Sequence, residues 1–357
     1  MSKGKKLGLL ATLLVVIIIV LLGVVYYFVV SNDISVNKDL NKQASYPRAL
    51  QDVTPALKPS EIESSPKATP PKTMQETTTK PSITLDKTLA PKQSTKLATP
   101  KPELTKAQKL DALHAKYIKT SHYKKPMIVI IIDDVSSRVH ERRIKSVGLA
   151  NLTPSLFPRQ PITPHTPEIA KDFKHYMIHL PLEAGGDYTD KSEWITMGES
   201  YRKIKKRIDE IRQDFPDAYY INNHTGHAFT SSKKDMLRLL KALDKDDFEF
   251  VDSKTIASNV VNDIGKKRGH FFLARDVFLD NDLDTNYIAK QMETFLKIAR
   301  LRGYAIAIGH PHPKTIATLK LYKDVINKYY NLVYIGTLDD FLREHVSYYG
   351  QKLEPDK

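Results

Sequence analysis

The sequence contains no cysteine. This absence excludes disulfide bonds, thiolate zinc sites and a cysteine nucleophile, so any metal ion must be held by histidine, aspartate and glutamate. The chain also lacks a glycine-rich phosphate-binding loop and a Gly-x-Ser-x-Gly turn. These are the minimum parts of kinase-like enzymes and serine hydrolases, and both classes are therefore excluded.

The formal net charge of +14 is concentrated in the first third of the chain. Residues 1–125 hold 20 Lys and Arg against 9 Asp and Glu, whereas residues 126–357 hold 35 against 32. A nucleic-acid-binding domain carries its excess charge as a patch on the folded part, so we expect no nucleic-acid partner. The basic segment either contacts an anionic surface or polymer or is a solvated charge run.

The N-terminal segment has the pattern of a membrane anchor. Lys3, Lys5 and Lys6 precede an uncharged run from Leu7 to Val30, and a helix of this length spans about 36 Å, enough to cross a bilayer. A cleaved signal peptide is the alternative, but the run ends in aromatic and branched residues without an Ala-x-Ala-like site. The lysines predict a cytoplasmic N-terminus, and hence a single-pass inner-membrane protein with its C-terminal domain on the periplasmic side.

Residues 31–105 have the composition of a disordered linker. They hold ten of the 21 prolines and are rich in Thr, Lys, Ser and Gln, without a sustained apolar period. A flexible chain of this length reaches roughly 50 Å. We therefore expect an anchor over residues 1–30, a linker over 31–105, a short helix near 106–122 and a folded domain over 126–347.

The folded domain alternates short apolar runs with amphipathic stretches, which is typical of repeated strand and helix units. Eight alternations predict an α/β fold with a (β/α) barrel of 7–8 parallel strands, and an open doubly wound sheet is the alternative. The predicted strands are 127–132, 152–156, 176–179, 218–222, 249–252, 270–273, 305–308 and 332–334. The predicted helices are 137–147, 166–174, 200–214, 233–244, 255–265, 286–302, 314–329 and 337–346.

Polar residues gather where the predicted strands end. In a parallel barrel all these ends open on one face, so side chains scattered over six loops would converge in space. The residues concerned are Asp133, Asp134, His179, Glu183, Asn222, Asn223, His224, His227, Asp252, Arg275, Asp276, His310 and His312.

Carboxylates and imidazoles converging without cysteine suit a divalent ion, most plausibly Zn²⁺ with an open position for water. Such an ion activates water and polarises a carbonyl, which favours hydrolysis of an amide or ester. Each residue taken alone has a simpler explanation: the Asp133–Asp134 pair could cap a helix, His179 could be a core histidine at a strand end, and His224 and His227 could be loop histidines that satisfy backbone groups.

Six motifs occur in an order that resembles the divergent polysaccharide deacetylase family. They are Ile-Ile-Asp-Asp, His-Leu-Pro-Leu-Glu, Asn-Asn-His, Val-Asp-Ser, Arg-Asp-Val-Phe-Leu-Asp-Asn-Asp and Ile-Gly-His-Pro-His-Pro. The family is similar to carbohydrate esterases that remove N- or O-acetyl groups from glycan polymers on a distorted (β/α) barrel with a divalent metal. The resemblance implies that Asp133 is the catalytic base, Asp134 and His179 are metal ligands, and His310 is the general acid.

The sequence departs from the ordinary deacetylase pattern after His179. Deacetylases place a second metal histidine four residues further along the chain, and that position is Glu183 here. His224, after the adjacent strand, is the expected replacement, with His227 in reserve. Further candidate site residues are Asp252 and His312, and the Arg275–Asp276 pair is expected to orient the base.

Two functions follow from this interpretation. The first is a metal-dependent carbohydrate deacetylase that acts on an envelope polysaccharide such as peptidoglycan. The second is a non-catalytic periplasmic module that binds a glycan or an envelope partner through the same cleft. Metal binding without acetate release would distinguish the second function from the first.

Overall fold

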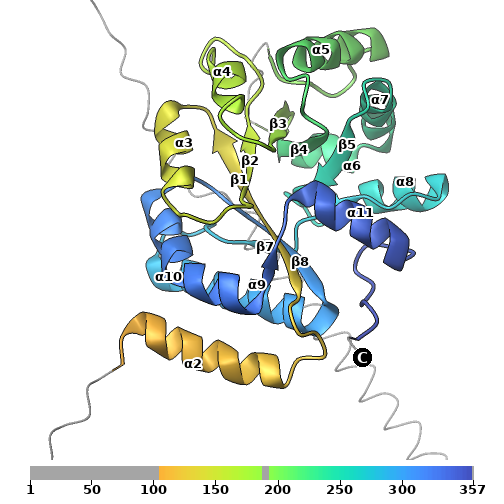
Figure 1. Cartoon of the computed structure of the whole chain (residues 1–357). Helices are drawn as coiled ribbons and strands as arrows, with labels where there is room; N and C mark the ends of the chain where they lie inside the picture. The colour runs from red at the N-terminus through yellow and green to blue at the C-terminus, as the bar shows by residue number, and fades with distance from the viewer. Residues whose placement is uncertain (1–103, 187–192, 356–357) are drawn as a thin grey trace, which may run out of the picture. The chain divides into compact units, whose positions relative to one another are not determined.

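Within the residues that the structure describes, nine strands, each parallel to its neighbours, form one curled sheet (Figure 1). The structure, a computed structural model, describes residues 104–186 and 193–355. The strand order is β6-β5-β4-β3-β2-β1-β8-β7, with β9 also paired to β1. The strands are β1 (Met127–Val135), β2 (Thr153–Leu156), β3 (Met177–Leu182), β4 (Tyr220–Thr225), β5 (Glu249–Asp252), β6 (Leu273–Ala274), β7 (Val277–Phe278), β8 (Tyr304–Gly309) and β9 (Asn331–Leu332).

Helices connect the strands, and several begin at a serine, threonine or aspartate whose side chain accepts a hydrogen bond from a backbone N–H of the first turn. Helix α2 packs beside α10, which in turn packs beside α9 (Figure 1). The helices are α2 (Lys106–Lys119), α3 (Arg138–Lys145), α4 (Thr166–Ala170), α5 (Tyr201–Asp214), α6 (His227–Ser231), α7 (Lys233–Asp244), α8 (Val260–Arg268), α9 (Thr285–Arg302), α10 (Pro313–Tyr329) and α11 (Ile335–His345).

The two faces of the sheet bury different sets of residues, and the alternation of β1 shows the division. Ile128, Ile130 and Ile132 belong to the large apolar core that includes the helices α5, α7, α9 and α10. Val129 and Ile131 belong to a second core on the opposite face, which includes residues of α11. By the same two-residue period, Asp133 continues the second face at the carboxyl end of β1. This face is therefore apolar along most of its length and polar at the carboxyl ends of the strands.

A two-residue link, Arg275 and Asp276, joins the opposite edges of the curled sheet. The backbone N–H of Arg275 donates to the carbonyl of Asp252 on β5, next to one edge strand, and that of Asp276 donates to the carbonyl of Ile306 on β8, next to the other. The Asp276 carboxylate accepts two hydrogen bonds from Arg302, at 2.9 and 2.5 Å, and one from the backbone N–H of Ile306 at 2.8 Å. The link thus fastens the seam of the barrel.

Removing the Asp276 carboxylate should weaken this seam. Asp276→Ala leaves the largely buried Arg302 guanidinium without its partner, and we expect a loss of about 3 kcal/mol in the free energy of unfolding, because an unpaired buried charge is costly. Chemical denaturation measures this loss. Asp111→Ala, which removes an exposed ion pair with Lys328, is the control and should leave the midpoint nearly unchanged. An equal midpoint for the two variants would contradict the role given to the seam.

The predicted parallel α/β arrangement is confirmed, and the differences concern short elements. Of the predicted strand 270–273, only Leu273 lies in a strand, the two-residue β6, and the two-residue β7 on the other side of the seam was not predicted. The predicted loop at His227 begins the five-residue helix α6. The predicted anchor over 1–30 and most of the linker lie outside the described residues, and within the described ranges no helix is long and apolar enough to cross a membrane.

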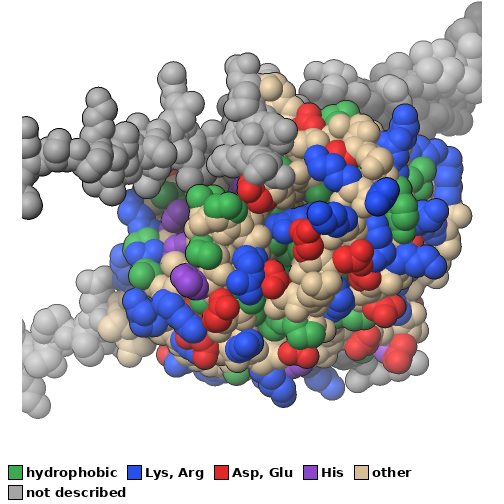
Figure 2. All heavy atoms as spheres, turned by 90° about the horizontal axis from the view of Figure 1, so that it is seen from above, with side chains coloured by type: hydrophobic (Ala, Val, Ile, Leu, Met, Phe, Trp, Pro, Cys, Tyr) green, Lys and Arg blue, Asp and Glu red, His purple; other side chains and the backbone are tan. Residues whose placement is uncertain are grey.

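Charged side chains of both signs are interspersed over the face of the molecule seen in Figure 2, and histidine side chains group near one edge of this view. Several of the charges in the domain form ion pairs, such as Arg159 with Asp214 and Lys205 with Asp246, each at 3.1 Å. Ion pairs that are partly open to solvent, as these are, contribute little to stability. On this face the positive charge is therefore mixed with negative charge.

Candidate metal centre

Strand register brings His179 and His224 together across β3 and β4. His179 pairs with Asn222, and Pro181 pairs with His224. Because side chains two residues apart on a strand share a face, Asn222 and His224 both lie on the face to which His179 points. The neighbouring strand β4 thus supplies a histidine, His224, close to His179. In the ordinary deacetylase pattern the second histidine is four residues after the first, and that position is Glu183 here.

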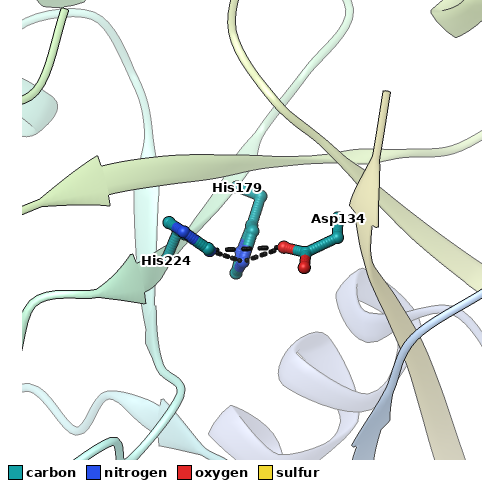
Figure 3. A group of neighbouring side chains, drawn as sticks. All are labelled: Asp134, His179 and His224. Carbon is teal, nitrogen blue, oxygen red and sulfur yellow. Dashed lines mark hydrogen bonds and ion pairs between the residues drawn. The ribbon is translucent and has the colours of Figure 1, made fainter. Parts of the chain in front are cut away.

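Asp134, His179 and His224 point toward a common centre (Figure 3). The distances are 3.1 Å from His179 Nε2 to His224 Nδ1, and 3.2 Å from each of these nitrogens to Asp134 Oδ1. Ligand atoms about 2.05 Å from a zinc ion stand about 3.3 Å apart at tetrahedral angles and about 2.9 Å apart at right angles. The three measured edges fall between these values, so the triangle fits a divalent ion with either geometry.

Burial and neighbouring charges favour the metal-binding forms of Asp134 and His224. Asp134 Oδ1 is buried and makes no hydrogen bond of normal geometry within the described chain. Burial alone would raise the pKa of Asp134, but His310 and His224 outweigh it and hold that pKa well below its usual range. Burial also lowers the pKa of His224, which favours the neutral imidazole that a metal requires.

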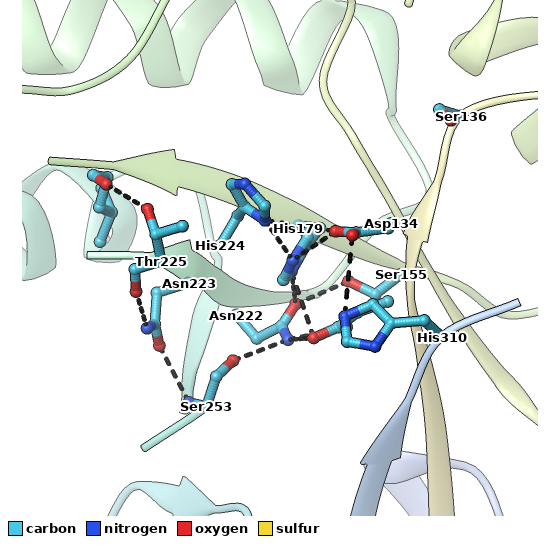
Figure 4. A network of polar contacts seen from close by, with 12 residues as sticks. Asp134, Ser136, Ser155, His179, Asn222, Asn223, His224, Thr225, Ser253 and His310 are labelled. Carbon is cyan, nitrogen blue, oxygen red and sulfur yellow. Dashed lines mark hydrogen bonds and ion pairs between the residues drawn. The ribbon is translucent and has the colours of Figure 1, made fainter. Parts of the chain in front are cut away.

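Asn222 sets the orientation of His179 from behind (Figure 4). His179 Nδ1 lies 3.2 Å from Asn222 Oδ1 and 3.4 Å from Asp133 Oδ2, so this nitrogen carries the hydrogen and Nε2 faces the triangle. Asn222 Nδ2 donates to both oxygens of Asp133 at 3.0 Å, and Ser155 donates to Asn222 Oδ1 at 2.6 Å. Partners of this kind orient metal ligands and raise their basicity.

Metal affinity should rise with pH. Burial would lower the pKa of His179, but the carboxylates of Asp133 and Asp134 outweigh it and raise that pKa above the usual value. A metal must displace this proton, so the affinity should increase as the pH rises through the raised pKa and then level off. Titration of Zn²⁺ in weakly chelating buffers of different proton affinity measures the proton released. Binding without proton release would contradict the assignment of His179 as a ligand.

His310 and Asp280 form a second pair beside the triangle. His310 Nδ1 lies 3.0 Å from Asp280 Oδ1, and Asp280 Oδ2 accepts hydrogen bonds from the His310 backbone and from Thr315. Burial would lower the pKa of His310, but the charges of Asp280 and Asp134 raise it to about 10. The other nitrogen, Nε2, lies 3.7 Å from Asp134 Oδ2. His310 therefore holds a proton next to the candidate metal site.

Backbone strain concentrates at the same edge of the sheet. Asp134, Thr225 and Lys254 have φ values of 58°, 49° and 50°, in a region that side chains other than glycine rarely adopt. The three residues lie at or just beyond the carboxyl ends of β1, β4 and β5. Strained residues of this kind persist where the surrounding structure fixes them, and they cluster at functional sites.

The other sequence candidates lie around this centre. Glu183 accepts a hydrogen bond from the Met197 backbone, and Asp252 accepts one from the Lys254 backbone. His312 lies close to His310 and Asp280. The remaining two candidates are placed as follows: His227 opens α6, and Arg275 donates to the backbone carbonyls of Ser253 and Lys254.

Sequence reasoning listed Asn222 among the converging residues without a role, and it did not single out Asp280 or Phe157. Asn222 and Asp280 stood within the quoted motifs, and their positions after apolar runs were the available signal. Phe157 packs against both histidines of the triangle, with ring centroids 5.4 Å from His179 and 4.9 Å from His224. It follows β2 directly, but a lone phenylalanine after a strand carries no signal for a site.

The sequence of residues 130–338 matches the family described as divergent polysaccharide deacetylase. The matched segment spans more than half of the chain and contains every residue of the metal triangle and the His310–Asp280 pair. This chain belongs to the divergent polysaccharide deacetylase family. The curled parallel α/β sheet is consistent with the deacetylase-like (β/α) barrel that the sequence predicted.

Individual relatives support this assignment without adding an activity. An uncharacterised protein of Haemophilus influenzae is 30% identical over 194 residues, 54% of this chain and 69% of its own length. The uncharacterised protein YibQ of Escherichia coli is 30% identical over 198 residues, 54% of this chain and 61% of its own length. An uncharacterised Agrobacterium tumefaciens structure shares the fold, with a TM-score of 0.53, 16% identity, and coverage of 63% of this chain and 94% of that one.

Proposed function

We propose that the protein is a metal-dependent hydrolase that removes acetyl groups from an envelope polysaccharide such as peptidoglycan. The observation that carries this proposal is the triangle of Asp134, His179 and His224 beside the His310–Asp280 pair. Membership of the divergent polysaccharide deacetylase family supports the substrate class. The three ligand residues would hold the ion, and Zn²⁺ is the proposed metal because the donors are two imidazoles and one carboxylate.

The residues around the triangle supply the groups that amide or ester hydrolysis needs. A divalent ion bound there would polarise the acetyl carbonyl and acidify water. Asp133, whose pKa is raised by burial, is the proposed base that accepts a proton from the attacking water. His310 is the proposed acid that gives its Nε2 proton to the departing sugar nitrogen or oxygen as the bond to the acetyl carbon breaks. The products are acetate and the free amine or alcohol.

The proposed location is the outer side of the inner membrane, with residues 1–30 as a single-pass anchor. The apolar run from Leu7 to Val30 and the preceding lysines support this location. A reporter enzyme that is active only in the periplasm, fused after Lys357, should be active. Activity of a cytoplasm-specific reporter at the same position would overturn the proposed location.

Acetate release tests the proposed activity. The full-length protein loaded with Zn²⁺ should release acetate from acetylated peptidoglycan fragments or chito-oligosaccharides, and removal of the metal by a chelator should abolish the release. The chelated protein reloaded with Zn²⁺ is the control. Stoichiometric metal binding without acetate release from N- or O-acetylated glycans would favour the binding-module function instead.

A further inference from the structure

A second cavity opens at the opposite end of the barrel from the metal centre. It has a volume of about 220 Å³ and lies where the amino ends of β2 and β4 meet the first turn of α11. Tyr220 in its wall and His224 in the metal triangle are four residues apart on β4, which corresponds to roughly 13 Å along the strand. None of the residues that line this cavity belongs to the metal triangle or to the His310–Asp280 pair.

Tyrosine rings form much of the wall of this cavity: Tyr176, Tyr219, Tyr220 and Tyr334. The hydroxyl of Tyr220 donates to Asp339 and that of Tyr334 donates to the Ala150 carbonyl, each at 3.0 Å. These bonds fix the two rings in place. Tyr219 is 53% exposed and packs on Tyr220 with ring centroids 5.0 Å apart. A large aromatic ring is therefore held at the mouth of the cavity.

Hydrogen-bonding groups complete the wall. Thr153 lines the cavity and is 1% exposed, and its hydroxyl has no hydrogen-bond partner among the residues that the structure describes. Helix α11 begins here without a side-chain cap at Tyr334, and the first N–H groups of a helix have no acceptor within it. Two exposed aspartates, Asp217 and Asp340, supply acceptors. Donors, acceptors and aromatic faces thus meet in one small space.

These groups select against an anion and require a ligand that both donates and accepts hydrogen bonds. An anion would meet the carboxylates of Asp217 and Asp340, and a ligand with donors alone would leave the first N–H groups of α11 without an acceptor. A neutral polyhydroxylated ring avoids both conflicts: its C–H faces pack on tyrosine, and its hydroxyls donate to aspartate and accept from threonine and backbone N–H groups. We propose that this cavity binds a neutral sugar ring of a glycan chain, as a site separate from the metal centre.

Calorimetric titration of the metal-free full-length protein tests this proposal. Three tetrasaccharides serve as probes. The first is built of N-acetylglucosamine and is neutral, the second of glucosamine and is cationic, and the third of galacturonate and is anionic. Chelation of the metal prevents turnover during the titration. We expect the neutral probe to bind more tightly than both charged probes. Equal or tighter binding of a charged probe, or no binding of the neutral one, would overturn the proposal.

Variants assign the binding to the cavity. Tyr219→Ala should weaken binding of the neutral probe about 3- to 10-fold, because it removes the stacking ring, and Tyr219→Phe should restore it. Thr153→Val should also weaken binding. Tyr348→Ala removes a tyrosine of similar exposure, 58%, outside the cavity, and should have no effect. Equal affinity of Tyr219→Ala and Tyr348→Ala would refute the site. Acetate release is measured separately, so failure of the proposed activity leaves this result interpretable.

Discussion

Replacement of His179, His224 or Asp134 by alanine should lower the affinity for Zn²⁺ by more than about 100-fold. Each variant removes one corner of a triangle whose edges are 3.1, 3.2 and 3.2 Å, and the two remaining donors cannot enclose the ion. Loss of an outer-shell partner costs roughly 10–100-fold, so loss of a direct ligand should exceed that range. Competition with a chromophoric chelator measures the affinity.

Two further variants make this experiment specific. Asn222→Ala removes the partner of His179 Nδ1 but no ligand, and we expect an intermediate loss of roughly 10–100-fold. His227→Ala removes a half-buried histidine on α6 outside the triangle and should leave the affinity unchanged. Wild-type affinity in His179→Ala, with the protein folded by circular dichroism, would show that the metal centre lies elsewhere.

Long periodic segments made most of the fold predictable. The predicted ranges 233–244 and 249–252 coincide with α7 and β5, because an amphipathic stretch and a bounded apolar run each carry a strong periodic signal. Strands β6 and β7 have two residues each, too few to show a period. Their existence depends on backbone hydrogen bonds from Arg275 and Asp276 to opposite edges of the sheet, and such long-range contacts leave no local pattern.

The convergence of Asp134, His179 and His224 was predictable because parallel strands open at one edge. That rule named thirteen residues, and the choice of these three as candidate metal ligands came from the family resemblance. The same rule did not predict the position of Asp276. This residue also follows a short strand, but its carboxylate pairs with Arg302 at the end of α9. The role of Asn222 depends on strand register, which aligns it with His179 across β3 and β4, and register cannot be read from one strand alone.

Replacement of His310 by glutamine should reduce acetate release by about 100- to 10,000-fold, the usual contribution of a general acid, while Zn²⁺ affinity changes little. Glutamine keeps a polar side chain near Asp134 but carries no acidic proton. Asp133→Asn should cause a loss of similar size if Asp133 is the base. Because Asp133 also contacts His179, a parallel loss of metal affinity in Asp133→Asn would assign it to ligand orientation. Unchanged acetate release in His310→Gln would exclude His310 as the acid.

Asp280→Asn tests the contribution of the proton on His310 separately from that of the imidazole ring. The charges of Asp280 and Asp134 raise the pKa of His310 to about 10, so a reaction that needs the protonated imidazole should slow only as the pH rises through that value. Removing the Asp280 charge lowers this pKa, and the alkaline fall in rate should then begin at lower pH, with Zn²⁺ affinity retained. Rates of acetate release across the alkaline range check this shift. An alkaline limb at the same pH in both proteins would mean that it reports another group.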